Sequence, residues 1–170
     1  MNKKNKMRKR KNKPIVYAFI DSQNLNLGVR SQGWELDFRR FRIYLHEKYN
    51  VKNAYLCIGY IPNNKKLYDF LKEAKYILIY KPVLEPKHAK VKVKGNVDAE
   101  LVLHAMIEFP KYNKAIIVSG DGDFHCLIEY LHGKNKLAKI IVPNKKYSSL
   151  LRKFSNYIVN IDLMKSKLKQ

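Results

Sequence analysis

Four aspartates are candidates for a single site, because each lies where an apolar segment begins or ends. They are Asp21, Asp98, Asp121 and Asp123. Carboxylates brought within a few ångströms repel one another, and a divalent cation removes that repulsion directly. Oxygen ligands of this kind suit Mg²⁺ or Mn²⁺. An ion of that class can activate water for attack on a phosphodiester, so the residue types predict metal-dependent phosphodiester hydrolysis.

Each of these acids also has a simpler interpretation. Asp98 and Asp123 could cap the helices that follow them. Asp21 could lie in a turn, and Asn24 could close an Asx turn. Asp21, Asp121 and Asp123 follow predicted strands and Asp98 begins a buried helix, however, so all four are expected at one rim of the sheet, and this favours a shared metal site over four unrelated roles.

The rest of the chain alternates between segments of strand character and segments of helical periodicity. The predicted strands are Ile15–Ile20, Ala54–Tyr60, Tyr76–Tyr80, Ala115–Ser119, Ala138–Val142 and Tyr157–Ile161, and the predicted helices are Leu36–Tyr49, Asn63 or Asn64 to Ala74, Val97–Phe109, Asp123–Leu131 and Ser148–Phe154. Strands that are apolar throughout and alternate with helices predict an α/β fold with a mostly parallel sheet between two helical layers. Ligands of such sheets bind at the carboxyl ends of the strands, where the acids lie.

The charge of the chain is strongly positive. It has 170 residues, with 35 Lys and Arg against 14 Asp and Glu, and a formal net charge of +21. Residues 1–14 contain eight of the basic residues, no acid and no apolar periodicity, so we expect a disordered basic arm there. We expect one domain at 15–161 and a basic C-terminal tail at 162–170. The positive field attracts polyanions such as nucleic acid, although A·T-rich coding would produce the same lysine-rich bias.

Composition also excludes several classes of protein. Two Cys in 170 residues rule out a disulfide scaffold and a Cys-rich zinc site. No apolar run approaches the roughly 18 residues of a membrane span, and the run after the basic start is too short for a secretory signal. We therefore expect a soluble, cytoplasmic protein without a membrane partner. The sequence leaves its oligomeric state open.

Lysines near the predicted site could hold a nucleic-acid backbone. Lys90, Lys92 and Lys94 alternate with valines, so an extended backbone would place all three on one side. There they could contact phosphates without reading bases, or they could form the solvated face of an edge strand. Lys145 and Lys146 follow the fifth predicted strand and are further candidates. Among these lysines we expect Lys92, Lys94 and Lys145 to bind substrate.

Three motifs carry a resemblance to a known family. They are Ile20-Asp21-Ser22-Gln23-Asn24-Leu25, Lys94-Gly95-Asn96-Val97-Asp98 and Ile117-Val118-Ser119-Gly120-Asp121-Gly122-Asp123-Phe124. Together they resemble the NYN domain family, the LabA-like branch of the PIN-like nucleases, in the family's order over about residues 15–161. The resemblance implies a three-layer α/β/α, Rossmann-like fold and metal-dependent cleavage of RNA. By motif match the four aspartates take the acidic positions, with Asn24 beside them and Ser119 in the same signature.

The combined prediction is a Mg²⁺- or Mn²⁺-dependent ribonuclease. The four aspartates would hold one or two ions, Asn24 would orient a ligand or water, and Ser119 would contact substrate. The expected partner is RNA, with single strands favoured and DNA as the other candidate. The alternative is a nucleic-acid-binding module of the same fold with little or no turnover. A phosphatase of the haloacid-dehalogenase type ranks low, because Gln23 stands where that chemistry requires a second aspartate.

Overall fold

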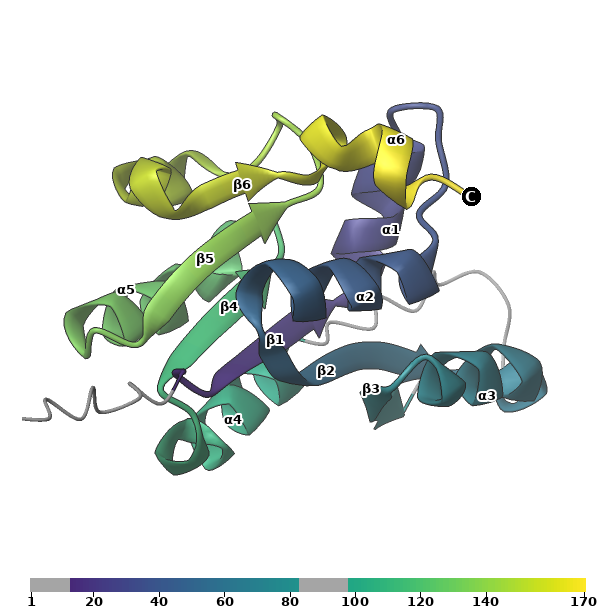
Figure 1. The fold of residues 1–170 in the computed structure, drawn as a ribbon, viewed down its shortest axis with the longest axis horizontal. Helices are drawn as coiled ribbons and strands as arrows, with labels where there is room; N and C mark the ends of the chain where they lie inside the picture. The colour runs from purple at the N-terminus through teal and green to yellow at the C-terminus, as the bar shows by residue number, and fades with distance from the viewer. Residues whose placement is uncertain (1–12, 83–97) are drawn as a thin grey trace, which may run out of the picture.

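The computed structural model describes residues 13–82 and 98–170. A six-stranded sheet in the order β3-β2-β1-β4-β5-β6 forms its centre (Figure 1), and every neighbouring pair of strands is parallel. The strands are β1 (Val16–Asp21), β2 (Val51–Tyr60), β3 (Tyr76–Pro82), β4 (Lys114–Val118), β5 (Leu137–Val142) and β6 (Ile158–Asn160). The helices are α1 (Ser22–Arg30), α2 (Phe38–Tyr49), α3 (Lys65–Glu73), α4 (Asp98–Ile107), α5 (His125–Gly133) and α6 (Lys165–Leu168). The predicted three-layer α/β/α fold is therefore confirmed, with an all-parallel sheet.

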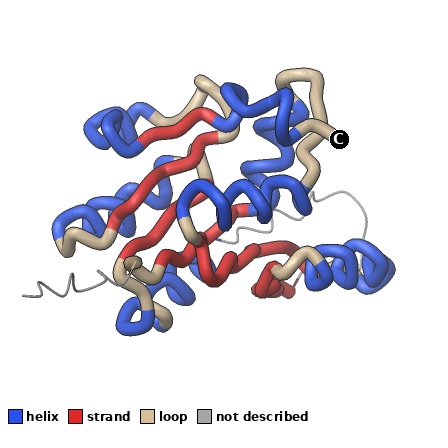
Figure 2. The backbone as a smooth tube through the Cα atoms, in the orientation of Figure 1, coloured by secondary structure: helices blue, strands red, loops and turns tan. Residues whose placement is uncertain are grey.

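Side chains of the central strand β1 alternate between two hydrophobic cores, as the pleat of a strand requires. Ala18 and Ile20 pack in a core shared with α1, α2, α3 and α6. Tyr17 and Phe19 pack in the other core, with α4 and α5. Helices therefore cover both faces of the sheet (Figure 2). This burial on both sides explains why the strands are apolar throughout.

Helix α1 was missed by the sequence prediction, which placed only turns after Asp21. The segment is rich in Ser, Gln and Asn, and its core-facing apolar residues are Leu25 and Val29, one turn apart. The Asp21 side chain accepts a hydrogen bond from the Asn24 backbone N–H and so caps the helix. A good N-cap and burial of a narrow apolar stripe offset the weak helix propensity of the polar residues.

The predicted C-terminal tail is folded onto the body of the protein. Residues 162–170 include most of the 3-10 helix Ile161–Met164 and all of α6. Leu168 is buried in the core beside α2, and its carbonyl accepts the Asp37 backbone N–H at 2.8 Å. The Arg40 guanidinium donates to the Lys169 carbonyl at 2.6 Å. The sequence of this segment is dominated by lysines, so the one apolar residue of α6 that is buried, Leu168, gave little signal.

Two further placements differ from the sequence prediction. A 3-10 helix, η3 (Gly122–Phe124), precedes α5, so Asp123 lies in a tight turn before the helix. The segment after β5 is a 3-10 helix, η4 (Ser149–Tyr157), which Ser148 caps through its hydroxyl. No helix in the described ranges is both long and apolar enough to cross a membrane.

The parallel sheet brings the polar motifs to one edge. β1 and β4 are neighbours, with Ile20 paired to Val118 in register, so both strands end at the same level. Asp21 ends β1, and the Ser119–Asp123 turn follows β4. α4 packs over β1 and places its first residue, Asp98, near that edge.

Candidate metal centre

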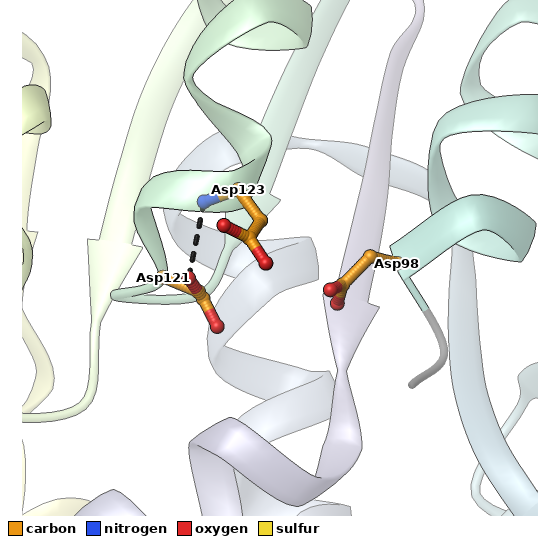
Figure 3. A group of neighbouring side chains, drawn as sticks. All are labelled: Asp98, Asp121 and Asp123. Carbon is orange, nitrogen blue, oxygen red and sulfur yellow. Dashed lines mark hydrogen bonds between the residues drawn. The ribbon is translucent and has the colours of Figure 1, made fainter. Parts of the chain in front are cut away.

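Three aspartates from two distant segments converge at the carboxyl edge of the sheet. Asp98, Asp121 and Asp123 each offer a carboxylate oxygen, and these oxygens all lie within 4.8 Å of one another. Figure 3 shows the three side chains reaching toward a common space between the start of α4 and the η3 turn. Asp123 is exposed and the other two are half-buried. An all-oxygen set of this kind, open on one side, fits a hard divalent cation that retains several waters.

The turn after β4 is held by hydrogen bonds between its own side chains and its backbone. The Ser119 hydroxyl accepts the Asp121 backbone N–H at 3.1 Å, and Asp121 Oδ1 accepts the Asp123 backbone N–H at 3.0 Å (Figure 3). A Cβ on Gly122 would lie 2.4 Å from the Ser148 hydroxyl, so a larger residue would displace the Ser148 side chain that caps η4. These contacts set the direction of Asp121 before any ligand binds.

Asn24 joins the two strands that carry the site. Its Oδ1 accepts the Gly120 backbone N–H at 2.9 Å, a contact between residues 96 positions apart. Its own backbone N–H donates to Asp21 Oδ1 at 3.0 Å. Asn24 also lines the cleft that contains the aspartates. We expected Asn24 to orient a ligand or water, and the structure shows that its side-chain oxygen also positions the acidic turn.

Asp21 lies in the same cleft but outside the group of three. Its side chain caps α1, and the residue is 5% exposed. Burial is the largest effect on this carboxyl and raises its pKa to about 6. The hydrogen bond from the Asn24 N–H opposes that rise, and the charges of Asp98 and Asp121 add to it. A cation held by the neighbouring carboxylates would favour the ionised form of Asp21 instead.

A buried thiol beneath the cleft experiences the same negative field. Cys57 of β2 pairs with Asp21 of β1 in the sheet. Burial raises the pKa of the Cys57 thiol to about 12, with smaller contributions from the charges of Asp21, Glu100 and Asp98. Glu100 forms an ion pair with Lys81 at 3.7 Å. Excess negative charge at the carboxyl edge, in a chain with a net charge of +21, favours the binding of a cation there.

The aspartates lie in a cleft of about 520 Å³. Besides the acids and Asn24, it is lined by Gln23, Leu27, Gly28, Ser31, Gly120, Pro143, Asn144, Lys146 and Tyr147. One wall is therefore a face of α1, and another is the loop between β5 and η4, which adjoins α1 at Gly28. The cleft is large enough for part of a polymeric substrate in addition to an ion.

The expected substrate-binding residues have different placements. Lys146 lines the cleft, whereas Lys145, the lysine that we expected there, is exposed and outside the lining. Lys92 and Lys94 lie outside the described residues, as do residues 1–12 of the basic arm. Ser119 is 1% exposed and does not line the cleft. Its hydroxyl lies beneath the acidic turn and contacts the Asp121 backbone instead.

The loop wall is attached to α1 at a glycine that sequence reasoning did not single out. The Gly28 carbonyl accepts Nε2 of Gln32 and Nδ2 of Asn144, both at 3.1 Å. Gln32 Nε2 also donates to the Pro143 carbonyl at 2.7 Å. A Cβ on Gly28 would lie 2.5 Å from Pro143 Cγ. A glycine inside a polar helix was the available signal, because such a residue often marks a close approach of two backbones.

Replacing Gly28 with Ala is expected to lower the free energy of unfolding by about 1–3 kcal/mol, the usual cost of forcing a methyl group into packed structure. Urea denaturation of the two proteins measures this difference. Gly133→Ala is the matched control, because within the described residues no atom outside the adjoining helix backbone lies within 4 Å of the Cβ position there. A Gly28→Ala protein as stable as Gly133→Ala would contradict the close contact with Pro143.

Comparisons with known proteins support both the fold and the motifs. The family model described as NYN domain matches residues 16–162. The low amplitude and bright protein LabA of Synechococcus elongatus is 22% identical over 168 residues, covering 87% of this chain and 84% of that protein. A crystal structure of a protein of unknown function from Vibrio parahaemolyticus has a TM-score of 0.75 at 23% identity. The superposition covers 94% of this chain and 98% of the Vibrio chain. At this level of identity the similarity supports the fold alone.

The extent of the family match confirms the resemblance seen in the motifs. It begins at the first residue of β1 and ends just beyond β6, so it spans the whole sheet. All four aspartates and Asn24 lie within it. The chain therefore belongs to the NYN domain family.

Proposed function

We propose that this protein is a Mg²⁺- or Mn²⁺-dependent ribonuclease. The observation that supports the proposal most is the convergence of the Asp98, Asp121 and Asp123 carboxylates within 4.8 Å at the carboxyl edge of the sheet. Carboxylates this close are costly unless a cation neutralises them. Membership of a family with a nuclease fold and the net charge of +21 support nucleic acid as the substrate class.

In this proposal the residues of the cleft divide into ligands and positioning residues. Asp98, Asp121 and Asp123 hold the ion, and Asp21 adds charge beside them. Asn24 and Ser119 hold the turn that presents Asp121. A bound ion of this class supplies an activated water and neutralises charge on the scissile phosphate. The protein contributes the fixed arrangement of oxygens, which costs no reorganisation when substrate arrives.

The test is cleavage of a labelled single-stranded RNA by the full chain. We expect products with Mn²⁺ or Mg²⁺, none with excess EDTA, and recovery when Mn²⁺ is added back. Single-stranded DNA and duplex RNA of the same sequence serve as parallel substrates. Binding that weakens with salt but yields no product at any Mn²⁺ concentration would overturn the proposal in favour of a binding module without turnover.

Replacing Asn24 with Leu tests the positioning role. The substitution leaves the Gly120 N–H without its acceptor, so we expect the Mn²⁺ concentration for half-maximal activity to rise about 10–100-fold, as for other residues that orient metal ligands. Asn26→Leu is the matched control, since Asn26 lies on the same helix but not in the cleft. Equal Mn²⁺ concentrations for half-maximal activity in the two variants would contradict the role of Asn24 in positioning the acidic turn.

A further inference from the structure

The acids account for only part of the cleft. One face of α1 lines it along the length of the helix, at Asn24, Leu27, Gly28 and Ser31, which follow the spacing of a single helical face. At 1.5 Å per residue, this wall continues about 10 Å beyond Asn24. Leu27 is 57% exposed on it. Leu27 therefore adds apolar surface to the wall of the cleft that holds the acids, and ligand sites combine such surface with a few polar groups.

The loop between β5 and η4 is hydrogen-bonded at both ends. Near its start, the Asn144 amide donates to the Gly28 carbonyl at 3.1 Å, while its Oδ1 accepts the Lys146 backbone N–H at 2.8 Å. At its end, the Ser148 backbone N–H donates to the Gly120 carbonyl at 2.9 Å. The same loop is thus tied to α1 and to the acidic turn. Its position relative to the metal ligands is set before substrate binds.

This loop presents a cation and an aromatic ring to the cleft. Lys146 and Tyr147 both line it, and Tyr147 is also packed against the second hydrophobic core, so one side of it is anchored. The four acids that line the cleft are Asp21, Asp98, Asp121 and Asp123, and each belongs to the metal centre or its border. Beyond them the described walls include the charged Lys146, the apolar surface of Leu27, the ring of Tyr147 and the polar side chain of Gln23, whereas Ser31 and Asn144 hydrogen-bond to Gly28.

We propose that this part of the cleft binds the nucleotide next to the scissile phosphate, with Lys146 on its phosphate and Leu27 and Tyr147 against its sugar and base. The inference rests on the proposed function and specifies its substrate as a single strand. A lysine point charge suits a phosphate, and an apolar or aromatic side chain suits the face of any base. A cleft of about 520 Å³ lies within the range of about 300–1,000 Å³ that is usual for small-ligand sites, which is the scale of a short piece of one strand.

Adjacent lysines provide the test. Lys146→Gln and Lys145→Gln remove the same charge from neighbouring positions, and only Lys146 lines the cleft. The ligand is the 5′-phosphorylated dinucleotide pUpU, which is too short to reach distant basic residues. Calorimetry with the full chain in Ca²⁺ buffer is expected to show that Lys146→Gln weakens binding about 5–10-fold and Lys145→Gln less than about 2-fold, since a specific phosphate contact exceeds a general field effect.

A second variant tests the apolar contact. Leu27→Asn replaces an exposed side chain, so its effect on folding is expected to be small, and we expect it to weaken pUpU binding while leaving Mn²⁺ affinity unchanged. Equal effects of the two lysine variants, or no binding of pUpU by the unaltered protein, would overturn the subsite. Absence of Mn²⁺-dependent cleavage, with the contrast between the lysines retained, would contradict the proposed ribonuclease activity and not the subsite.

Discussion

Asp121→Asn is expected to reduce Mn²⁺-dependent RNA cleavage about 10³-fold, the upper range for removing one fixed charge-stabilising group from an active site. The side chain belongs to the group of three carboxylates that lie within 4.8 Å, and an amide is a much poorer ligand for a hard cation. Asn retains an Oδ1 that can accept the Asp123 backbone N–H, as Asp121 does at 3.0 Å. The turn should therefore persist while metal binding is lost.

Asp69→Asn is the control for this variant. It removes one negative charge from an exposed position on α3, outside the cleft, and should leave the cleavage rate within about 2-fold of the unaltered protein, because isolated surface charges contribute little. Single-turnover cleavage of a labelled RNA measures both variants. Cleavage by Asp121→Asn at a rate close to that of Asp69→Asn would show that the carboxylate cluster is not the catalytic centre.

Asp21→Asn is expected to stabilise the metal-free protein at neutral and higher pH. The folded-state pKa of Asp21 is raised from 3.8 to about 6, mainly by burial. Between these values the native state binds more protons than the unfolded state, so stability falls as pH rises and stays low above about pH 6. The full effect corresponds to about 3 kcal/mol at 1.36 kcal/mol per pKa unit. Asn caps a helix as well as Asp does, so the substitution removes the cost without removing the cap.

The measurement is urea denaturation in EDTA at about pH 4 and about pH 8. We expect the two proteins to have similar stabilities at the lower pH, where Asp21 is largely protonated in the folded state, and the Asp21→Asn variant to be the more stable protein at the higher pH. Added Mn²⁺ should stabilise the unaltered protein more than the variant, since a ligand that binds only the native state adds to stability. A variant less stable than the unaltered protein at about pH 8 would contradict the raised pKa.

A stabilising substitution that removes activity would show that the acids at this edge are retained for binding and not for folding.

The raised pKa of Asp21 also predicts that the Mn²⁺ concentration needed for activity increases as pH falls through about 6, because protons then compete with the cation for the charge of Asp21. Three of the four predicted acids form the close group, and Asp21 lies in the same cleft as the cap of α1.

The fold could be predicted because burial on both faces leaves a strong signal. Strands such as β1, which is buried at every position, appear in the sequence as short apolar runs, and their alternation with helices determines a parallel sheet. Helix α1 was less visible, because it packs mainly through Leu25 and Val29. The C-terminal helix was hidden for the same reason, since Leu168 is its one buried residue.

The finer roles in the cleft could not be predicted from residue types. Asn24 and Ser119 accept backbone N–H groups of the acidic turn, and such contacts depend on where distant segments meet. Lys145 and Lys146 are equivalent in sequence, and the difference between them comes from the Asn144 side chain, which binds the Lys146 backbone and α1 together. The choice between adjacent lysines is therefore a property of the loop and not of its composition.

A crystal structure of the full chain, grown with Mn²⁺ and measured at a wavelength where manganese scatters anomalously, would test the metal centre itself. We expect an anomalous peak between Asp98, Asp121 and Asp123, with carboxylate oxygens of at least two of them bonded directly to the ion. Three aspartate side chains turned away from one another, with no manganese in the space between them, would contradict it.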